Sequence, residues 1–195
     1  MTHEIREETA GALRSYLKHF PEEQARFDIL TAQLASGENL FVRSNMSGHV
    51  TSSVVVLNHS GTHVLLIAHK FLQQWLPPGG HYEPPGGIWD TGQREVEEET
   101  GVTNLTLHPW CRAHGVPLDI DTHAMPANPK KNEGAHFHHD FRYLAVATGN
   151  TQLVAQEAEV DGVRWAPLEE LLSMQDRRLH VLTAKLRAIG LMAEA

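Results

Sequence analysis

Residues 79–102 read GGHYEPPGGIWDTGQREVEEETGV, a glycine-rich loop followed by a run of acidic residues. The second half places four glutamates in five positions, and like charges three and four residues apart on a helix repel by roughly 0.2–0.5 kcal/mol per pair. On a helix, Glu95, Glu98 and Glu99 lie on one face about 100° wide. Carboxylate oxygens are the ligands that Mg2+ prefers, and its remaining ligands usually include substrate phosphates. The stretch therefore predicts a divalent-metal site that binds a phosphate-containing substrate.

The stretch resembles the signature of the Nudix hydrolases, G-x5-E-x7-R-E-U-x-E-E-x-G-U, where U is a bulky aliphatic residue. Gly80 matches the first glycine, Arg94 and Glu95 match the R-E pair, and Val102 matches the last aliphatic position. The chain departs from the signature at one position, where Gly86 replaces the first glutamate. This departure puts loop order, metal affinity or rate in question.

The resemblance implies Mg2+ or Mn2+ as the cofactor, held by Glu95, Glu98, Glu99 and the backbone carbonyl of Gly80. Arg94 would orient a glutamate of the helix by a charge-assisted contact. The implied reaction is attack of a metal-activated water on a diphosphate linkage. The substrate would be a nucleoside diphosphate derivative or a related organic pyrophosphate.

An acidic residue outside the signature often supplies another ligand or the general base in this family. Glu157 and Glu159, just before a predicted strand, are the candidates, and surface glutamates without such a role are equally common. The expected catalytic residues are Glu98, Glu95, Arg94 and Glu159. The alternative function is a nucleotide-binding or regulatory module that keeps the fold with weak or lost catalysis, unless Glu83 or Asp90 compensates for Gly86.

The chain contains 14 histidines. His136, His138 and Asp140 alternate along one predicted strand, and Asp119, Asp121 and His123 show the same alternation. Side chains two residues apart on a strand lie close enough to share a metal ion. These rows predict either a transition-metal site or a polar ligand cleft, and the sequence leaves both open.

The candidates for substrate binding are Arg43, Lys70, Arg142, His138 and Asp140. Aromatic residues surround the glycine loop in sequence and either stack on a base or pack in the core. They are Phe71, Trp75, Tyr82 and Trp89.

Periodicity predicts an α/β fold. Two amphipathic helices, over residues 4–20 and 21–36, form an N-terminal extension that either packs on the main domain or makes a dimer surface. Strands are expected at 50–57, 63–69, 102–108, 136–147 and 160–165, and helices at 90–100, 167–174 and 179–192. No βαβ unit repeats, so we expect a Nudix-like α/β/α sandwich with a mixed sheet. The predicted division is residues 1–37 and 38–195.

Composition narrows the function classes. A chain of 195 residues suits one main core, and a net charge of −8 disfavours a nucleic acid polymer as partner. Cys111 is the single cysteine, which fits a reducing compartment. The apolar runs are too short to span a bilayer, and the first residues lack the apolar core of a signal peptide. We expect a cytoplasmic protein that acts on small molecules, either as a monomer or as a homodimer.

Overall fold

The computed structural model describes residues 2–174 and 177–193. Its strands are β1 (His49–Leu57), β2 (His63–His69), β3 (Gln74–Leu76), β4 (Gly79–His81), β5 (Leu105–Leu107), β6 (Asp119–Met125), β7 (His136–Ala147) and β8 (Val160–Pro167). They form one eight-stranded mixed sheet with the central order β3-β2-β1-β7-β5, and β4, β6 and β8 pair with β1, β7 and β2. Strands β1 and β7 run parallel, whereas the other pairs are antiparallel.

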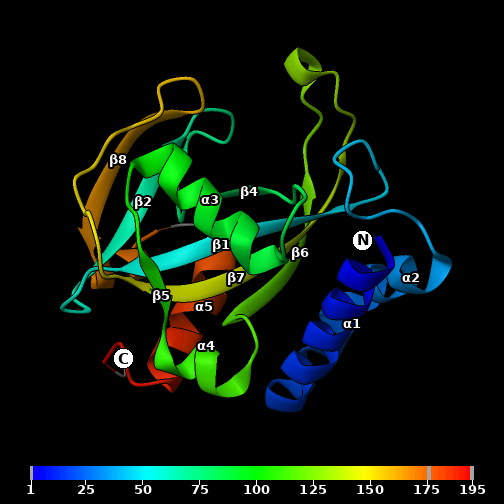
Figure 1. Cartoon of the computed structure of the whole chain (residues 1–195), viewed down its shortest axis with the longest axis horizontal. Coiled ribbons are helices and arrows are strands. Elements are labelled where there is room, and N and C mark those ends of the chain that lie inside the picture. Colours follow the sequence, from blue (N-terminus) through cyan, green and yellow to red (C-terminus); the bar gives the residue numbers. More distant parts are fainter. Residues whose placement is uncertain (1, 175–176, 194–195) are drawn as a thin grey trace.

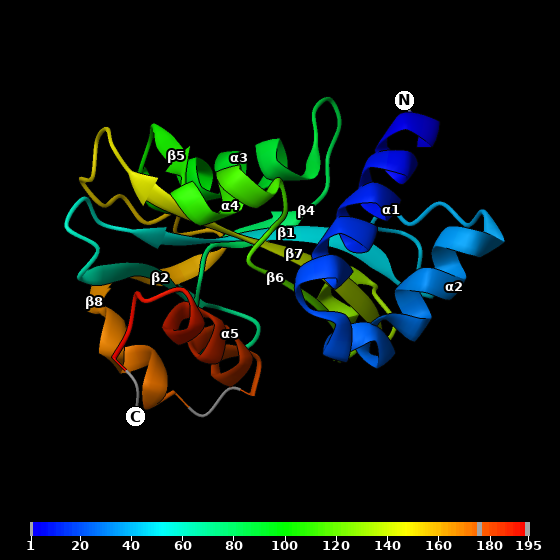
Figure 2. The same cartoon turned by 90° about the horizontal axis from the view of Figure 1, so that it is seen from below.

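Helices cover both faces of this sheet (Figures 1 and 2). They are α1 (Thr2–His19), α2 (Asp28–Ser36), α3 (Ile88–Thr100), α4 (Pro109–His114) and α5 (Arg177–Ala188). The alternation of side chains along β1 explains the two layers, because Val54 packs with Val96 of α3 and Val55 packs with Leu182 of α5. The expected sandwich with a mixed sheet is thus confirmed.

The N-terminal helices pack against one end of the sheet (Figure 2). A 3₁₀ turn over Pro21–Phe27 joins α1 to α2. Tyr16, Phe27 and Leu30 are fully buried in one cluster with Phe141 of β7. Of the two arrangements expected for these helices, packing on the main domain is the one observed. The domain boundary at residue 37 and the homodimer stay predictions.

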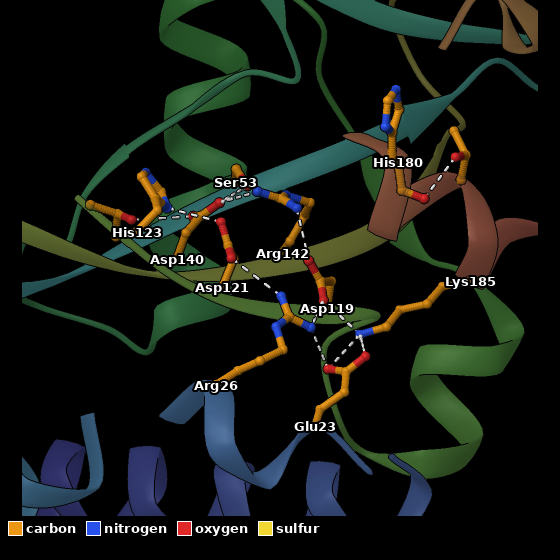
Figure 3. A network of polar contacts seen from close by, with 12 residues as sticks. Glu23, Arg26, Ser53, Asp119, Asp121, His123, Asp140, Arg142, His180 and Lys185 are labelled. Atoms are coloured by element: carbon orange, nitrogen blue, oxygen red, sulfur yellow. Dashed lines mark hydrogen bonds and ion pairs between the residues drawn. The ribbon is translucent and has the colours of Figure 1, made fainter. Parts of the chain in front are cut away.

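A buried charge network fastens this extension to the sheet and to α5 (Figure 3). Its centre is Asp119 of β6, which has no exposed surface. Its carboxylate accepts hydrogen bonds from Arg142 at 2.8 Å, from Lys185 at 2.6 Å and from Arg26 at 3.4 Å. Because these cations come from β7, α5 and the N-terminal turn, one carboxylate holds three parts of the molecule together.

The structure contains several elements that the sequence did not predict. Strands β3, β4 and β6 and helix α4 were not among the expected elements. Gly79–His81 reads as a glycine loop, and Pro109–His114 is too short for a helical period. Helix α3 begins at Ile88, two residues before the helix start predicted at residue 90. The strand predicted at 136–147 coincides with β7.

Candidate active site

The start of α3 is held by two carboxylates. The N-cap of α3 is Gly87, and Asp90 lies three residues later in the first turn. Its Oδ2 accepts a hydrogen bond from the backbone N–H of Gly87 at 2.7 Å. The carboxylate of Glu8, on α1, accepts a hydrogen bond from the backbone N–H of Ile88. Anionic groups suit this end of a helix because the unpaired N–H groups carry partial positive charge. The N-terminal extension therefore helps to place the acidic helix.

The four glutamates of α3 differ in exposure as their helical positions require. Glu95 and Glu99 are 8% and 4% exposed, whereas Glu97 points to solvent. The side chain of Glu98 is 49% exposed. Glu95 and Glu99 therefore lie on the inner side of the helix and Glu98 lies at its exposed edge, while Glu97 points away from the other three, as the spacing predicts.

Neighbouring groups hold these carboxylates in place. The guanidinium of Arg94 contacts Glu95 Oε1 at 3.0 Å and Glu98 Oε2 at 3.2 Å, and it also reaches Glu83 at 3.5 Å. The backbone N–H of Gly79 donates a hydrogen bond to Glu99 Oε2 at 3.0 Å. Strand β4, which carries Gly79, thus packs directly against the acidic face.

Burial sets the protonation of the inner pair. It raises the pKa of Glu95 to about 7, and the attraction of Arg94 offsets only part of this rise while Glu98 and Glu159 add to it. Burial also raises the pKa of Glu99 to about 8, against a lowering by the Gly79 hydrogen bond. Clustered carboxylates with raised pKa values suit a divalent cation, which relieves their repulsion.

The carboxylate oxygens of Glu95, Glu98 and Glu99 lie farther apart than the ligand atoms of a single metal site. Among the described residues, the one group of three or more potential ligands whose atoms all lie within 4.8 Å is formed by His49, His81 and His138. The glutamates of α3 are outside that limit, and Glu95 and Glu98 are paired with Arg94. The oxygen donors fit Mg2+ in chemical type, and we treat their role as ligands as a proposal.

A cavity of about 430 Å³ lies beside the acidic face and carries charge of both signs. The acidic helix contributes Glu95, Glu98 and Glu99, and the exposed Glu159 lies on the same cavity, unlike Glu157. Gly80 also lines it. The cationic side chains on its wall are Arg43, Lys70, Arg94, Lys131 and Arg142. Lys131 was not among the sequence candidates, since two adjacent lysines in a polar loop are common on protein surfaces.

The residues predicted to bind substrate line this cavity but differ in exposure and in their ion-pair partners. Arg43 pairs with Glu133 at 2.5 Å, and Lys70 lies 3.8 Å from Asp161 at the surface. Arg142 is buried, with one terminal nitrogen on Asp119 and the other on Asp140. Asp140 also accepts hydrogen bonds from Thr51 and Ser53. Arg142 and Asp140 therefore shape the wall, while Arg43 and Lys70 are the more accessible cations.

The loop before α3 explains how glycine fits at position 86. Gly86 has φ +119°, a backbone conformation that L-residues rarely adopt, and its carbonyl accepts a hydrogen bond from Tyr82 OH at 2.9 Å. A Cβ atom there would lie 3.0 Å from Asp90 Oδ2. Gly86 is not among the cavity residues, but Glu83 is. Of the two residues that were expected to compensate, Glu83 lies near the acidic face and Asp90 serves the helix start.

The aromatic residues around the loop have separate roles. Tyr82 is buried, Trp89 packs edge-on against Tyr143 at 5.2 Å, and Trp75 lies under the guanidinium of Arg164. Phe71 is 39% exposed and lines the cavity. Phe71 is thus the aromatic side chain of this group placed to contact a bound ring.

Histidines gather at the end of the cavity near the start of β1. The ring centroid of His49 lies 5.1 Å from His81, 4.7 Å from His136 and 4.8 Å from His138. Burial lowers the pKa of His81 to about 3 and also lowers the pKa of His49 and His138. These rings are therefore uncharged at neutral pH. Sequence reasoning missed His49 and His81, which lie far from His138 in the chain.

The acidic members of the predicted metal rows are otherwise engaged. Rows from β6 and β7 do face each other, with His123 paired to His138 and Asp121 paired to Asp140 in the strand register. However, Asp121 lies 3.2 Å from Arg26, and Asp119 and Asp140 pair with Arg142. His123 pairs with Asp121 at 3.0 Å, whereas His136 and His138 have the ring of His49 as a neighbour.

Comparison with known proteins places the fold. A model of the NUDIX domain matches residues 48–186. The chain belongs to the Nudix family. An Ap4A hydrolase from C. elegans, in a binary complex, superposes with a TM-score of 0.55 at 21% identity, over 72% of this chain and 96% of that chain. This likeness shows the shared fold.

Two relatives carry the names of hydrolases. A probable DHNTP pyrophosphohydrolase from Lactococcus lactis is 31% identical over 128 residues, 66% of this chain and 69% of the relative. The m7GpppN-mRNA hydrolase NUDT17 from Bos taurus is 40% identical over 79 residues, 40% of this chain and 24% of that protein. The chain thus spans about two thirds of the first relative and about a quarter of the second. The sequence-based prediction of a Nudix-type pyrophosphohydrolase is confirmed at the level of the family.

No helix among residues 2–174 and 177–193 has the length and apolar character needed to cross a membrane. The cytoplasmic location stays a prediction.

Proposed function

We propose that the chain is a Mg2+-dependent hydrolase that cleaves a diphosphate linkage in a nucleoside diphosphate derivative or a related organic pyrophosphate. The observation that carries the proposal is the pair Glu95 and Glu99, two buried carboxylates beside a cavity of about 430 Å³ that is also lined by cations. Burying two ionised carboxylates together is unfavourable unless bound protons or a cation neutralise them. A polyphosphate with its metal ion supplies the matching charges.

Each side chain of the acidic face has a role in this proposal. Glu95, Glu98 and Glu99, with the carbonyl of Gly80, would hold Mg2+ or Mn2+, and the bound ion would acidify a water and offset the charge that develops on phosphate. Arg94 orients Glu95 and Glu98 through its two ion pairs. Glu98 and Glu159 are exposed, so either carboxylate can accept a proton from water.

The remaining wall of the cavity suits the rest of the substrate. Arg43, Lys70 and Lys131 present positive charge to phosphate oxygens. Phe71 presents an exposed ring on which a base or another planar ring stacks. The names of the two relatives suggest a panel that contains DHNTP and a capped dinucleotide beside nucleoside triphosphates and nucleoside diphosphate sugars.

The test is phosphate and pyrophosphate release from this panel in Mg2+ and in Mn2+, with wild type, Glu98→Gln and Glu97→Gln. We expect Glu98→Gln to lower turnover by at least about a hundredfold, as loss of a preorganised charged group does elsewhere. Glu97→Gln is the matched control, because Glu97 is on the same helix and points to solvent. Turnover by Glu98→Gln within twofold of wild type refutes the role of Glu98.

A second function has one observation in its favour, the glycine at position 86. A protein that binds a nucleotide in the same cavity without hydrolysing it would need Arg43, Lys70 and Phe71 but not Glu98. Calorimetric titration separates the two functions. Binding without turnover across the panel supports the module, and turnover that needs Glu98 supports the hydrolase.

A further inference from the structure

Three histidines from three strands meet beside the cavity. His49 begins β1, His81 ends β4 and His138 lies in β7. Each offers a ring nitrogen, and the three ligand atoms lie within 4.8 Å of one another. Ligands around a single Zn2+ lie at about 2.0–2.1 Å from the ion, so small side-chain rotations bring such a set to bonding distance.

The register of the sheet creates this meeting. His49 pairs with His138 across the parallel β1–β7 ladder, and His81 pairs with Thr51 across the β1–β4 ladder. His49 and Thr51 are two residues apart on β1 and so point to the same face. The three imidazoles are therefore fixed by backbone hydrogen bonds of the central strands, which makes the site rigid.

The ring of His49 is prepared to bind a metal ion. It is 1% exposed, and its Nδ1 lies 3.0 Å from the backbone carbonyl of Asn45. A carbonyl only accepts, so Nδ1 carries the proton and Nε2 carries a lone pair. Nε2 is buried without a hydrogen-bond partner. A carbonyl that orients the imidazole and a free opposite nitrogen are the usual surroundings of a histidine metal ligand.

His138 is oriented by His136, which is itself held by the backbone carbonyl of Gly134. His136 Nδ1 lies 2.7 Å from the carbonyl of Gly134, so it carries the proton, and Nε2 is left to accept. His136 Nε2 lies 3.1 Å from Nε2 of His138, which therefore donates. This assignment leaves a lone pair on Nδ1 of His138. His136 is thus a positioning residue for the ring of His138.

We propose that His49, His81 and His138 bind one transition-metal ion, for which Zn2+ is the best match, at a site separate from the acidic face of α3. Three neutral imidazoles select Zn2+ and its neighbours in the first transition series, whereas Mg2+ prefers oxygen ligands. Three protein ligands leave a fourth position for water or a substrate oxygen. Because His81 and His138 line the cavity, that position is accessible to a bound phosphate.

The surrounding acids do not compete for this ion. Asp140 is hydrogen-bonded to Ser53 and Arg142, and Asp121 pairs with Arg26. On the other side, the backbone carbonyl of His81 accepts a hydrogen bond from Arg94 at 3.5 Å. The guanidinium of Arg94 thus contacts both the backbone of His81 and the carboxylates of Glu95 and Glu98.

The test uses the full chain, without a polyhistidine tag, after dialysis against a chelator. Co2+ is added as a spectroscopic probe, because tetrahedral Co2+ with nitrogen ligands absorbs visible light strongly. We expect one equivalent of Co2+ to produce this absorption and one equivalent of Zn2+ to remove it. Isothermal titration gives the Zn2+ affinity of each variant, and circular dichroism confirms that each variant is folded.

The variants separate this site from the proposed hydrolase site. We expect His81→Gln and His138→Gln to weaken Zn2+ binding at least tenfold, because loss of an orienting neighbour alone costs about 10–100-fold. His136→Gln should weaken it less and shift the Co2+ spectrum. His59→Gln, in an exposed turn, and Glu98→Gln should leave the affinity within twofold of wild type.

Several results would overturn the proposal. Wild type that binds no Co2+ or Zn2+ at micromolar concentration refutes it directly. Zn2+ binding that is lost in Glu98→Gln but kept in His81→Gln places the ion on the acidic face. Because the readouts are a spectrum and an affinity, the result does not depend on whether any substrate of the panel is hydrolysed.

Discussion

A Cβ atom on Gly80 would lie 2.4 Å from the carboxyl carbon of Glu95. Strand β4 therefore approaches the acidic helix so closely that a side chain at this position would have to displace the carboxylate of Glu95. Gly80→Ala should push the Glu95 carboxylate out of place and lower turnover by about ten- to a hundredfold, since small displacements of catalytic groups have such effects. Steady-state rates on the best substrate of the panel check this.

The matched control for that variant is Gly162→Ala in β8. A Cβ there would sit at an ordinary 3.6 Å from Trp75, so turnover should stay near that of wild type. An equal loss of turnover in both variants would show that the effect is general and not specific to Glu95.

Glycine at position 86 leads to a second prediction. Because φ is +119° and Asp90 lies against the missing side chain, Gly86→Glu should destabilise the protein by about 1–3 kcal/mol. It should not raise turnover, since Gly86 is not among the cavity residues. Urea unfolding and the hydrolysis assay are measured together. Gly86→Ala shares the strain without the carboxylate, so higher turnover in Gly86→Glu alone would contradict the prediction.

Asp119 is expected to be important for stability. Asp119→Ala leaves Arg142 and Lys185 buried without their shared partner, which should lower the free energy of unfolding by about 3–5 kcal/mol. Asp119→Asn keeps the shape and should lose less. Asp161→Ala is the control, because that surface pair with Lys70 should contribute less than about 1 kcal/mol. Urea denaturation curves that coincide for the two alanine variants would disprove this.

Local patterns predicted the long elements and the acidic face, and tertiary pairing decided the rest. The 3.6-residue period placed Glu95 and Glu99 inward, and the apolar alternation predicted β7. Strand β4 contains two glycines and one histidine, which carry no strand signal, and it exists because β1 pairs with it. The contact of His49 with His81 depends on that pairing, so no spacing in the chain reveals it.

The raised pKa values of the inner glutamates predict how stability varies with pH. In the metal-free protein, burial raises the pKa of Glu99 from 4.5 to about 8. Between pH 4.5 and pH 8 the folded state therefore binds more protons than the unfolded state. Its contribution to stability is complete below pH 4.5 and is lost as the pH rises through 8. Melting temperatures in chelator should therefore fall between pH 6.5 and 8.5.

The variants identify the group responsible. Glu99→Gln should flatten this decline, whereas Glu97→Gln should keep it, because Glu97 is exposed. Excess Mg2+ should also flatten it in wild type, since the cation takes the place of the protons. Parallel declines in wild type and Glu99→Gln would assign the titration to another group.

Phe71 gives a prediction about the substrate. Its ring is 39% exposed on the cavity, so a bound base or another planar ring gains stacking energy there, about 1–3 kcal/mol in comparable contacts. Phe71→Ala should raise KM by about five- to a hundredfold for substrates that carry a ring. It should leave kcat within about threefold, because the proposed chemistry depends on the carboxylates of α3 and not on this ring.

The control for Phe71→Ala is Val154→Ala, an exposed apolar residue that is not among the cavity residues. Inorganic tripolyphosphate, which has no ring, serves as the control ligand, and its affinity should be equal in wild type and Phe71→Ala. If Phe71→Ala weakens binding of tripolyphosphate as much as binding of a nucleotide, the ring does not stack and the residue acts on the shape of the cavity.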